Sequence, residues 1–370
     1  MVAMGGGEEF PQRGKSDREL LLFTAPHKEG DVDQIVAEIQ KEFTNLDVEF
    51  VQPGSDGKTQ VPKELYQRAN YLTTFTWLPP NASEVPDLKF IQFLSAGVNH
   101  IANHPIYTDS KIPLLSANGV HGPQIAEWVV MMYLVHNHKY VALYEQQKQK
   151  LWKPETGKDV TDSPGKTVGI LGYGSIGRQV ARVAKAMGMN VLAYTASPRP
   201  TPESRRDDGF IVPGTGDPDG SFPSAWYSGL DKESLHEFLK QKIDLLVLAV
   251  PLTKTTTHFL SAAEFEVLNQ SNPAGTYVVN ISRGPVIDQP QLVKALNEKL
   301  IGGAALDVTD PEPLPKDDPL WDTPNVLITP HISGSTSAYS TRATQVLQEN
   351  LRRLRDGKKL INEVDRDKGY

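Results

Sequence analysis

Three ionisable side chains late in the sequence could together perform acid–base chemistry on a small anion. Arg283, Glu312 and His331 each follow an apolar run that has the length and composition of a buried strand. Each is therefore expected at the carboxyl end of a strand, the edge at which open α/β sheets bind ligands. A guanidinium can orient a carboxylate and polarise a carbonyl, and a carboxylate beside an imidazole favours its protonated form and fixes its tautomer. The three residues predict a site in which His331 and Glu312 exchange a proton with a substrate that Arg283 orients.

A glycine-rich turn upstream predicts where a dinucleotide would bind. Gly172, Gly174 and Gly177 stand between the strand-like run 167–171 and the helix-like run 177–187. In a dinucleotide site such glycines allow a tight turn, an approach to the pyrophosphate and close helix–strand packing, and the helix N-terminus binds the anion. Because a second strand-like run follows the helix, the spacing favours a dinucleotide site over an ordinary turn.

The end of that second run bears on the choice of cofactor. An acid that would bind the ribose 2′-hydroxyl of NAD is expected there, and the sequence has Thr195. A carboxylate would repel a 2′-phosphate, whereas Thr195 and Ser197 offer neutral hydrogen bonds and Arg199 offers a charge-assisted one. This predicts NADP as the preferred cofactor, with NAD possible. The alternative is that Arg199, Arg205 and Arg206 are solvated surface charges.

Composition limits the classes of partner. The 370 residues include 38 Lys and Arg against 45 Asp and Glu, a net charge of −7, which argues against nucleic acid and anionic membrane as partners. There is no cysteine, so thiolate catalysis, disulfides and cysteine-ligated zinc are excluded. No metal site is predicted. The longest apolar runs fall short of a membrane span, and the first 18 residues lack the pattern of a signal peptide, so we expect a cytoplasmic protein with a small-molecule substrate.

Strand-like and helix-like runs alternate, which predicts an α/β fold with parallel sheets covered by helices on both faces. The pattern restarts after a long helical run at 124–150, which indicates a second domain, and a final amphipathic helix is expected over 335–357. Residues 200–229 break the alternation because they are rich in Pro, Gly and Asp, and we expect a long surface insertion there. The strand-like runs are residues 19–25, 70–77, 88–96, 167–171, 191–194, 243–251, 274–282, 301–308 and 325–330.

Five motifs resemble the D-isomer-specific 2-hydroxyacid dehydrogenase family, which includes glyoxylate/hydroxypyruvate reductases and phosphoglycerate dehydrogenases. They occur in the family's order, and the resemblance covers nearly the whole chain after about Asn70. The motifs are GYGSIG (172–177), VPLTKTTTHFL (250–260), NISRGPVID (280–288), GGAALDVTDPEPL (302–314) and NVLITPHISGST (325–336).

The resemblance implies two doubly wound parallel-sheet domains, with a Rossmann cofactor domain inserted into a flavodoxin-like substrate domain. The substrate-binding domain would comprise residues 1–121 and 336–370, and the dinucleotide-binding domain residues 122–335. The family's active site lies in a cleft between such domains and closes on binding. The helix at 125–135 would support a homodimer, although its apolar face is equally compatible with ordinary core.

The resemblance also implies individual roles. Arg283, Glu312 and His331 match the catalytic triad, and Asp307 would hold the nicotinamide carboxamide. His121 is a possible substrate contact, with a structural histidine as the alternative. The implied cofactor-binding residues are Gly172, Tyr173, Gly174, Ser175, Ile176, Gly177, Thr195, Ser197, Arg199, Val250, Pro251, Ile281, Ser282, Asp307 and Ser333. The implied substrate-binding residues are Ala96, Gly97, Val98, Arg283 and His121.

Three functions remain to be weighed. The leading hypothesis is an NADPH-preferring reductase that interconverts a small 2-oxo acid, such as glyoxylate or hydroxypyruvate, and the corresponding D-2-hydroxy acid. A formate-dehydrogenase-like enzyme is disfavoured because that branch carries Gln where this sequence has Glu312. The alternative from another class is a dinucleotide-sensing interaction protein resembling the C-terminal-binding corepressors, although Thr195 in place of an acid argues against an NAD sensor.

Overall fold

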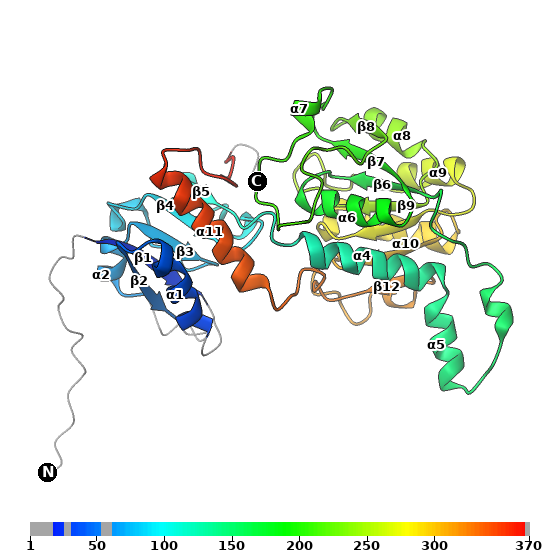
Figure 1. Cartoon of the computed structure of the whole chain (residues 1–370). Coiled ribbons are helices and arrows are strands. Elements are labelled where there is room, and N and C mark those ends of the chain that lie inside the picture. Colours follow the sequence, from blue (N-terminus) through cyan, green and yellow to red (C-terminus); the bar gives the residue numbers. More distant parts are fainter. Residues whose placement is uncertain (1–17, 26–30, 53–60, 367–370) are drawn as a thin grey trace, which may run out of the picture. The chain divides into compact units, whose positions relative to one another are not determined.

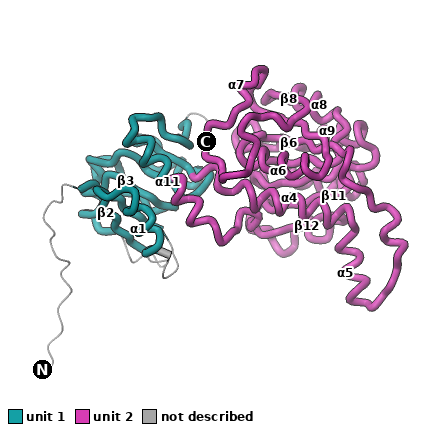
Figure 2. Tube along the Cα trace, viewed as in Figure 1, with its two compact units in different colours: residues 1–116, 347–366 teal, residues 117–346, 367–370 magenta. Residues whose placement is uncertain are grey.

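The computed structural model of the protein describes residues 18–25, 31–52 and 61–366. Residues 1–17, which carry most of the stretch compared above with a signal peptide, lie outside these ranges. The chain forms two compact units, coloured separately in Figure 2: unit 1 comprises Met1–Ser116 with Leu347–Arg366, and unit 2 contains Ala117–Val346. No helix in the described ranges combines the length and the apolar composition that crossing a bilayer requires.

Unit 1 is built on a five-stranded parallel sheet in the order β2-β1-β3-β4-β5. This is the strand order of flavodoxin-like sheets. Apart from the edge strand β2, its strands are runs of buried side chains, as expected for a parallel sheet covered on both faces. The strands are β1 (Glu19–Thr24), β2 (Leu46–Val51), β3 (Tyr71–Thr74), β4 (Phe90–Phe93) and β5 (Leu114–Leu115). The helices are α1 (Asp31–Glu42), α2 (Lys63–Arg68), η1 (Ala82–Glu84), η2 (Asn99–Ile101), α3 (Pro105–Thr108) and most of α11 (Tyr339–Arg355).

Unit 2 is built on a seven-stranded parallel sheet in the order β12-β11-β10-β9-β6-β7-β8, seen among its helices in Figure 1. The order reverses at β6, whose neighbours are β7 on one side and β9 on the other, and such a reversal opens a crevice at the carboxyl ends of the strands. The strands are β6 (Thr167–Leu171), β7 (Asn190–Thr195), β8 (Ala225–Ser228), β9 (Leu245–Leu248), β10 (Tyr277–Asn280), β11 (Gly303–Leu306) and β12 (Val326–Ile328). The helices are α4 (Gly122–Asn137), α5 (Tyr140–Lys148), η3 (Pro154–Gly157), α6 (Ser175–Ala186), α7 (Pro202–Arg205), α8 (Lys232–Leu239), α9 (Ala262–Ser271), η4 (Gly284–Val286), α10 (Gln289–Asn297) and η5 (Pro319–Asp322).

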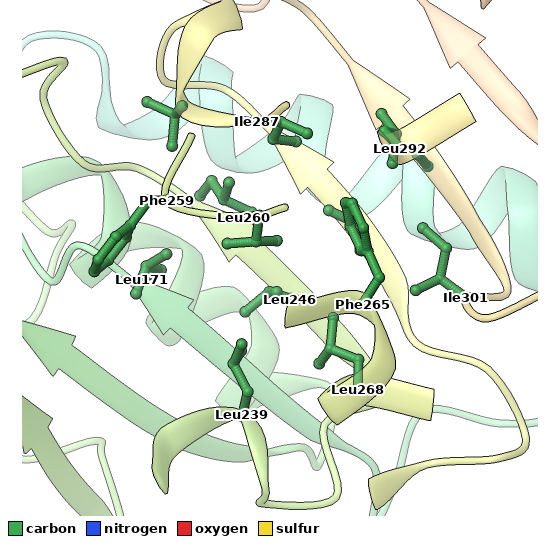
Figure 3. Close-up of a cluster of buried hydrophobic side chains, with 14 of the residues drawn as sticks. Leu171, Leu239, Leu246, Phe259, Leu260, Phe265, Leu268, Ile287, Leu292 and Ile301 are labelled. Atoms are coloured by element: carbon green, nitrogen blue, oxygen red, sulfur yellow. The ribbon is translucent and has the colours of Figure 1, made fainter. Parts of the chain in front are cut away.

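Two apolar clusters fill the two faces of this sheet. On one face α4 and α6 contribute Trp128, Val129 and Val180 beside Ile170 of β6. On the other face α8, α9 and α10 pack over the strands, and Figure 3 shows part of that cluster. Each fully buried aliphatic or aromatic side chain contributes about 1.5–3 kcal/mol. The side chains labelled in Figure 3 are Leu171, Leu239, Leu246, Phe259, Leu260, Phe265, Leu268, Ile287, Leu292 and Ile301. Both units therefore confirm the predicted α/β class with two doubly wound parallel sheets.

The boundaries between the two units fall after Ser116 and after Val346, close to the predicted domain boundaries at 121 and 336. One contact near these boundaries lies within unit 2. Arg342, in the first turns of α11, donates from Nη1 to the carbonyl oxygen of Val120 at 3.2 Å. The start of α11 and the residues just before α4 are therefore packed together and belong to unit 2.

The stretch 200–229 is more ordered than its composition suggests. It begins with the short helix α7 and ends with β8, which pairs in parallel with β7, and Asp217 near its middle is 1% exposed. The expectation of an irregular surface insertion was therefore wrong at both ends. The aromatic pair Trp226 and Tyr227 forms the β8 strand, a signal too short to stand out among the neighbouring prolines and glycines.

A half-buried histidine links the stability of unit 2 to pH. The ring of His136 at the end of α4 stacks on Tyr277 with centroids 4.2 Å apart. Burial, and secondarily the charge of Lys139, lowers the pKa of His136 from 6.5 to about 4. The folded state thus resists protonation that the unfolded chain accepts.

We expect the free energy of unfolding to fall as the pH drops from about 6.5 towards about 4, because protons then bind the unfolded chain preferentially. His136 contributes on the order of 3 kcal/mol to this loss. His136→Gln should flatten the dependence of the urea midpoint on pH across this window, whereas His138→Gln, at an exposed neighbouring position, should leave it unchanged. Equal pH dependence in His136→Gln and the parent protein would contradict this assignment.

Candidate active site

The glycine turn after β6 has the geometry of a dinucleotide loop. Gly172 has φ 105°, and a Cβ there would lie 2.6 Å from the carbonyl oxygen of Ala249. A Cβ on Gly177 would lie 2.3 Å from the carbonyl oxygen of Gly172, so this glycine permits the close packing of α6 on the turn. Both positions therefore require glycine.

The residue that precedes α6 borders open space. A Cβ on Gly174, the residue that precedes the helix, would meet no atom within 4 Å, and no side chain caps this helix end. The N–H groups of the first helical turn have no acceptor within the helix, and together with the positive end of the helix dipole they suit an anion. The loop thus fits the pyrophosphate of a dinucleotide, with room above Gly174 for it.

The other residues of the loop differ in their surroundings. Ser175 donates from Oγ to Asn118 Oδ1 at 2.9 Å, and Ile176 is half-buried. The side chain of Tyr173 is 4% exposed, and its hydroxyl donates to Asp217 Oδ2 at 2.7 Å. Tyr173 therefore offers a cofactor only its backbone.

The expected cofactor residues beyond β9 and β10 lie at the same carboxyl edge. Val250 and Pro251 follow β9, and the carbonyl oxygen of Pro251 accepts a hydrogen bond from Thr256 Oγ1 at 2.7 Å. Ile281 and Ser282 follow β10 and are 7% and 5% exposed. The residues after β9 lie beside the glycine turn because β9 pairs with β6, and those after β10 lie one strand further along the sheet.

The expected 2′-site lies at the end of β7. Thr195 is the last residue of the strand, and its Oγ1 donates to the carbonyl oxygen of Ser197 at 2.8 Å. Ser197 and Arg199 are exposed. Arg199 donates from Nη1 to the carbonyl oxygen of Ser204 at 2.7 Å, which orders this arginine at the surface.

Glu312 and His331 are in direct contact. Glu312 Oε1 lies 2.6 Å from His331 Nδ1, and the two side chains are 41% and 46% exposed. Because an ionised carboxylate can only accept, Nδ1 carries the proton of this bond and Nε2 is left for a substrate. The pair can therefore transfer a proton at Nε2.

The backbone that carries His331 is held by Asp307. The Asp307 carboxylate, 2% exposed, accepts hydrogen bonds from Thr329 Oγ1 at 2.5 Å, from the backbone N–H groups of Ile332 and Ser333 at 2.9 Å each, and from Ser333 Oγ at 2.5 Å. The Asp307 carbonyl oxygen accepts the His331 N–H at 2.9 Å. His331 itself has φ 56°, in the left-handed region. The four acceptor positions of the carboxylate are thus used by the chain, and a nicotinamide carboxamide would have to share them.

Arg283 lies next to the segment that carries Glu312. It follows β10, as Glu312 follows β11 and His331 follows β12, and these strands are neighbours in the sheet. A Cβ on Gly284 would lie 1.8 Å from the carbonyl oxygen of Thr309, so glycine allows the two segments to meet. Arg283 donates from Nη1 to the carbonyl oxygen of Ser282 at 2.7 Å. In the described ranges no carboxylate pairs with its guanidinium, which leaves donors for an anionic ligand.

The expected substrate-binding turn lies in unit 1. Ala96, Gly97 and Val98 follow β4, and Ser95 Oγ donates to the carbonyl oxygen of Gly97 at 2.8 Å. No hydrogen bond among the described residues uses the backbone N–H groups of these three residues. The turn therefore presents free donors at the carboxyl edge of its sheet.

His121 lies beside the segment that follows His331. Its ring packs edge-on against Tyr339 with centroids 5.1 Å apart, and a Cβ on Gly334 would lie 3.3 Å from His121 Cδ2. Burial, and secondarily Arg342, lowers its pKa to about 4. Nδ1 is buried and has no hydrogen-bond partner among the described residues.

Three further residues support the site and were not predicted from the sequence. Asn280 donates from Nδ2 to the carbonyl oxygen of Arg283 at 3.1 Å, Thr329 donates to Asp307, and Gln124 donates from Nε2 to the carbonyl oxygen of Gly334 at 3.1 Å. Asn280 and Thr329 could have been noticed as polar residues at the ends of apolar runs. Gln124 had no such signal, because its partner is 210 residues away.

Comparison with known proteins adds to this geometry. Residues 130–211 and 220–333 match the family model described as D-isomer specific 2-hydroxyacid dehydrogenase, NAD binding domain. The chain is 32% identical to a glyoxylate reductase of Thermofilum pendens over 72% of this chain and 71% of that protein. It is 31% identical to glyoxylate/hydroxypyruvate reductase A of Citrobacter koseri over 80% of this chain and 86% of that protein.

Solved structures of the same family are similar to this chain. The NADPH-dependent glyoxylate/hydroxypyruvate reductase of Sinorhizobium meliloti, in complex with NADP and sulfate, is 25% identical with a TM-score of 0.70, over 95% of this chain and all of that one. A D-isomer specific 2-hydroxyacid dehydrogenase of Xanthobacter autotrophicus, in complex with NADPH and MES, is 26% identical with a TM-score of 0.71 over the same shares.

The structure predicts that Asp307→Asn loosens the backbone that carries His331. In the asparagine variant an NH2 group, itself a donor, faces N–H and O–H donors that need an acceptor. The backbone amides of Ile332 and Ser333 should therefore exchange with solvent at least about tenfold faster, as measured by hydrogen-exchange mass spectrometry. Asp310→Asn, at an exposed position nearby, should leave their protection unchanged. Unaltered protection in Asp307→Asn would show that the carboxylate does not hold this segment.

Proposed function

This chain belongs to the D-isomer specific 2-hydroxyacid dehydrogenase family of NAD(P)-dependent oxidoreductases, and on that premise we propose that it interconverts a small 2-oxo acid and the corresponding D-2-hydroxy acid. Glyoxylate and hydroxypyruvate are the proposed 2-oxo acids, the former giving achiral glycolate. The observation that carries the proposal is the 2.6 Å contact between Glu312 and His331 at the sheet edge that also bears Arg283.

In the direction of reduction, His331 gives the proton at Nε2 to the substrate oxygen that becomes the hydroxyl group. Glu312 accepts the hydrogen bond of Nδ1 and so stabilises the charged ring before the transfer. In the direction of oxidation the neutral ring removes the same proton. The chemistry that a bound nicotinamide cofactor supplies is hydride transfer to or from the substrate carbon.

Substrate orientation is assigned to two sets of donors. The Arg283 guanidinium has the fork geometry that binds a carboxylate and polarises an adjacent carbonyl. The free N–H groups of Ala96, Gly97 and Val98 suit the substrate carboxylate. His121 stays a proposed substrate contact on the strength of its unpartnered Nδ1.

The cofactor would be held by the turn at 172–177 and by residues after the neighbouring strands. Backbone N–H groups of α6 would bind the pyrophosphate, and the 249–251 turn lies against Gly172. On the nicotinamide side the proposed residues are Ile281, Ser282, Asp307 and Ser333, although Ser333 and Asp307 are also bonded to each other.

We expect purified protein to consume reduced nicotinamide cofactor with 2-oxo acids such as glyoxylate and hydroxypyruvate. His331→Ala and Glu312→Gln should each lower kcat, His331→Ala by about 10²–10⁴-fold because proton transfer is lost. Arg283→Ala should raise KM and lower kcat together. Glu298→Gln, an exposed acid in the same unit, is the matched control and should retain activity.

Two results would count against this function. Retained turnover in His331→Ala would refute its role as proton donor. The absence of turnover with every 2-oxo acid, together with tight dinucleotide binding, would instead favour the dinucleotide-sensing interaction protein.

We propose NADP as the preferred cofactor. No acid stands at the end of β7, and Arg199 is exposed and ordered there. The S. meliloti and X. autotrophicus structures are of complexes with NADP and NADPH. An NADPH-linked reduction also fits the cytoplasmic location expected from the sequence.

Thr195→Asp should lower kcat/KM with NADPH at least about tenfold and leave that with NADH nearly unchanged, because a carboxylate repels the 2′-phosphate. Arg199→Ala should weaken the binding of NADPH more than the binding of NADH. Lys185→Ala removes a charge at the far end of α6 and should change neither the kcat/KM with NADPH nor that with NADH. If the parent protein uses NADH as well as NADPH, Arg199 is only a surface charge.

A homodimer through α4 and α5 is also proposed. No residue of α5 is buried, and a set of large apolar side chains on these helices and just beyond them is exposed, which is typical of a protein interface. A monomeric mass by sedimentation equilibrium would exclude it. The exposed residues are Met131, Tyr140, Val141, Leu143, Tyr144, Leu151 and Trp152.

A further inference from the structure

A buried guanidinium is among the groups of α6 that hold the insertion, residues 200–229. Arg178 is 5% exposed. Its Nη1 donates to the carbonyl oxygen of Asp217 at 2.5 Å, its Nη2 donates to the carbonyl oxygen of Arg205 at 2.6 Å, and its Nε lies 3.5 Å from Asp207 Oδ2. A single side chain of the helix thus fixes three points of the insertion.

Asp217 connects the same cluster to the dinucleotide loop. Its carboxylate accepts the Tyr173 hydroxyl at 2.7 Å and the backbone N–H groups of Ser221 and Phe222 at 2.9 and 3.1 Å. Tyr173 stands between the first two glycines of the loop. The aspartate therefore folds the insertion on itself and bonds it to the loop that is proposed to bind the pyrophosphate.

The residues expected to meet the adenosine 2′-group form a second compact piece. Arg199 donates from Nη1 to the carbonyl oxygen of Ser204 at 2.7 Å, and Arg205 donates from Nε to the carbonyl oxygen of Arg199 at 2.9 Å. The guanidinium of Arg205 also lies over the ring of Trp226, 5.6 Å from its centroid. We call residues 195–206 the specificity segment; its residues 200–206 are also the first part of the insertion.

The specificity segment meets the rest of the insertion, residues 207–229, at the carbonyl group of Arg205. This group accepts the bond from Arg178, and Gly220 approaches it so closely that a Cβ there would lie 2.5 Å from its oxygen. Gly220 has φ 64°, which glycine adopts without strain. The specificity segment is thus held against α6 through Arg178 and is braced by the insertion.

We propose that Arg178 and Asp217 are positioning residues for recognition of a 2′-phosphorylated adenosine, because they fix the distance between the specificity segment and the dinucleotide loop. The inference rests on the proposed dinucleotide-dependent function. Neither side chain needs to touch the cofactor. A charged hydrogen bond to phosphate depends on placement, and a donor that is ordered before binding loses less entropy.

Arg182 provides a matched control on the same helix. It donates from Nε to the carbonyl oxygen of Gly216 at 2.7 Å, and its guanidinium lies 5.4 Å from the centroid of the Phe222 ring. It therefore binds the insertion as Arg178 does, but none of these contacts reaches the specificity segment.

The test is a titration of the full chain and its variants with NADPH, NADH, adenosine 2′,5′-bisphosphate and AMP by isothermal calorimetry. Arg178→Lys keeps the charge but loses the fork, so Kd for NADPH and for the bisphosphate should rise about tenfold more than Kd for NADH and AMP. Arg182→Lys should change the ratio of the two cofactor affinities less than about twofold.

Tyr173→Phe tests the same cluster with a change that should not disturb folding. It deletes one hydroxyl and keeps the ring, and it should shift the cofactor ratio in the same direction as Arg178→Lys with a thermal midpoint close to that of the parent protein. Asp217→Asn replaces one acceptor oxygen of the cluster with an amide donor and should shift the ratio in the same direction.

Two outcomes overturn the inference while the proposed cofactor preference stands: an unchanged ratio in Arg178→Lys, or an equal shift in Arg182→Lys. If Arg178→Lys lowered the affinities for NADPH and NADH equally, Arg178 would have a merely structural role, and this result would overturn the inference too. A parent protein that binds NADPH no better than NADH is the separate failure, because the proposed cofactor preference then falls before any variant is compared.

Discussion

The buried carboxylate of Asp307 is the interaction on which the candidate site depends. It joins the end of β11 to the backbone that follows β12, and through that backbone it sets the direction of the His331 ring. A desolvated carboxylate is costly unless donors surround it, and here four donors do so. The Glu312 and His331 side chains can therefore stay exposed to a substrate while the main chain beneath them is fixed.

The dinucleotide turn likewise combines a tightly packed main chain with groups that are exposed to a ligand. Gly172 and Gly177 are in positions that permit no side chain, whereas Gly174 faces open space. Close packing on one side of the turn leaves the other side to an anion. Both sites lie at carboxyl ends of strands in one sheet, so the order of the strands brings the cofactor turn and the acid–base pair to a common edge.

Much of this arrangement was predictable from the sequence because its signals are local. Arg283 and His331 directly follow their apolar runs, Glu312 comes a few residues after its own, and the glycine spacing encodes the turn. The role of residues 200–229 was not predictable, since it depends on contacts over long separations such as that of Arg178 with Asp217. Tyr173 shows the same limit: its place between two glycines indicated the cofactor, but its side chain turns to Asp217.

The close fit of the insertion on α6 has a consequence for protein engineering. Removing residues 200–229, or replacing them with a shorter connection from a relative, would expose the Arg178 guanidinium and the Tyr173 ring and would leave their hydrogen-bonding groups without partners. Gly220 could accept no side chain in a transplanted copy unless the Arg205 carbonyl group moved as well. Helix and insertion therefore form one exchangeable module, and a chimaera that divides them has to redesign both surfaces.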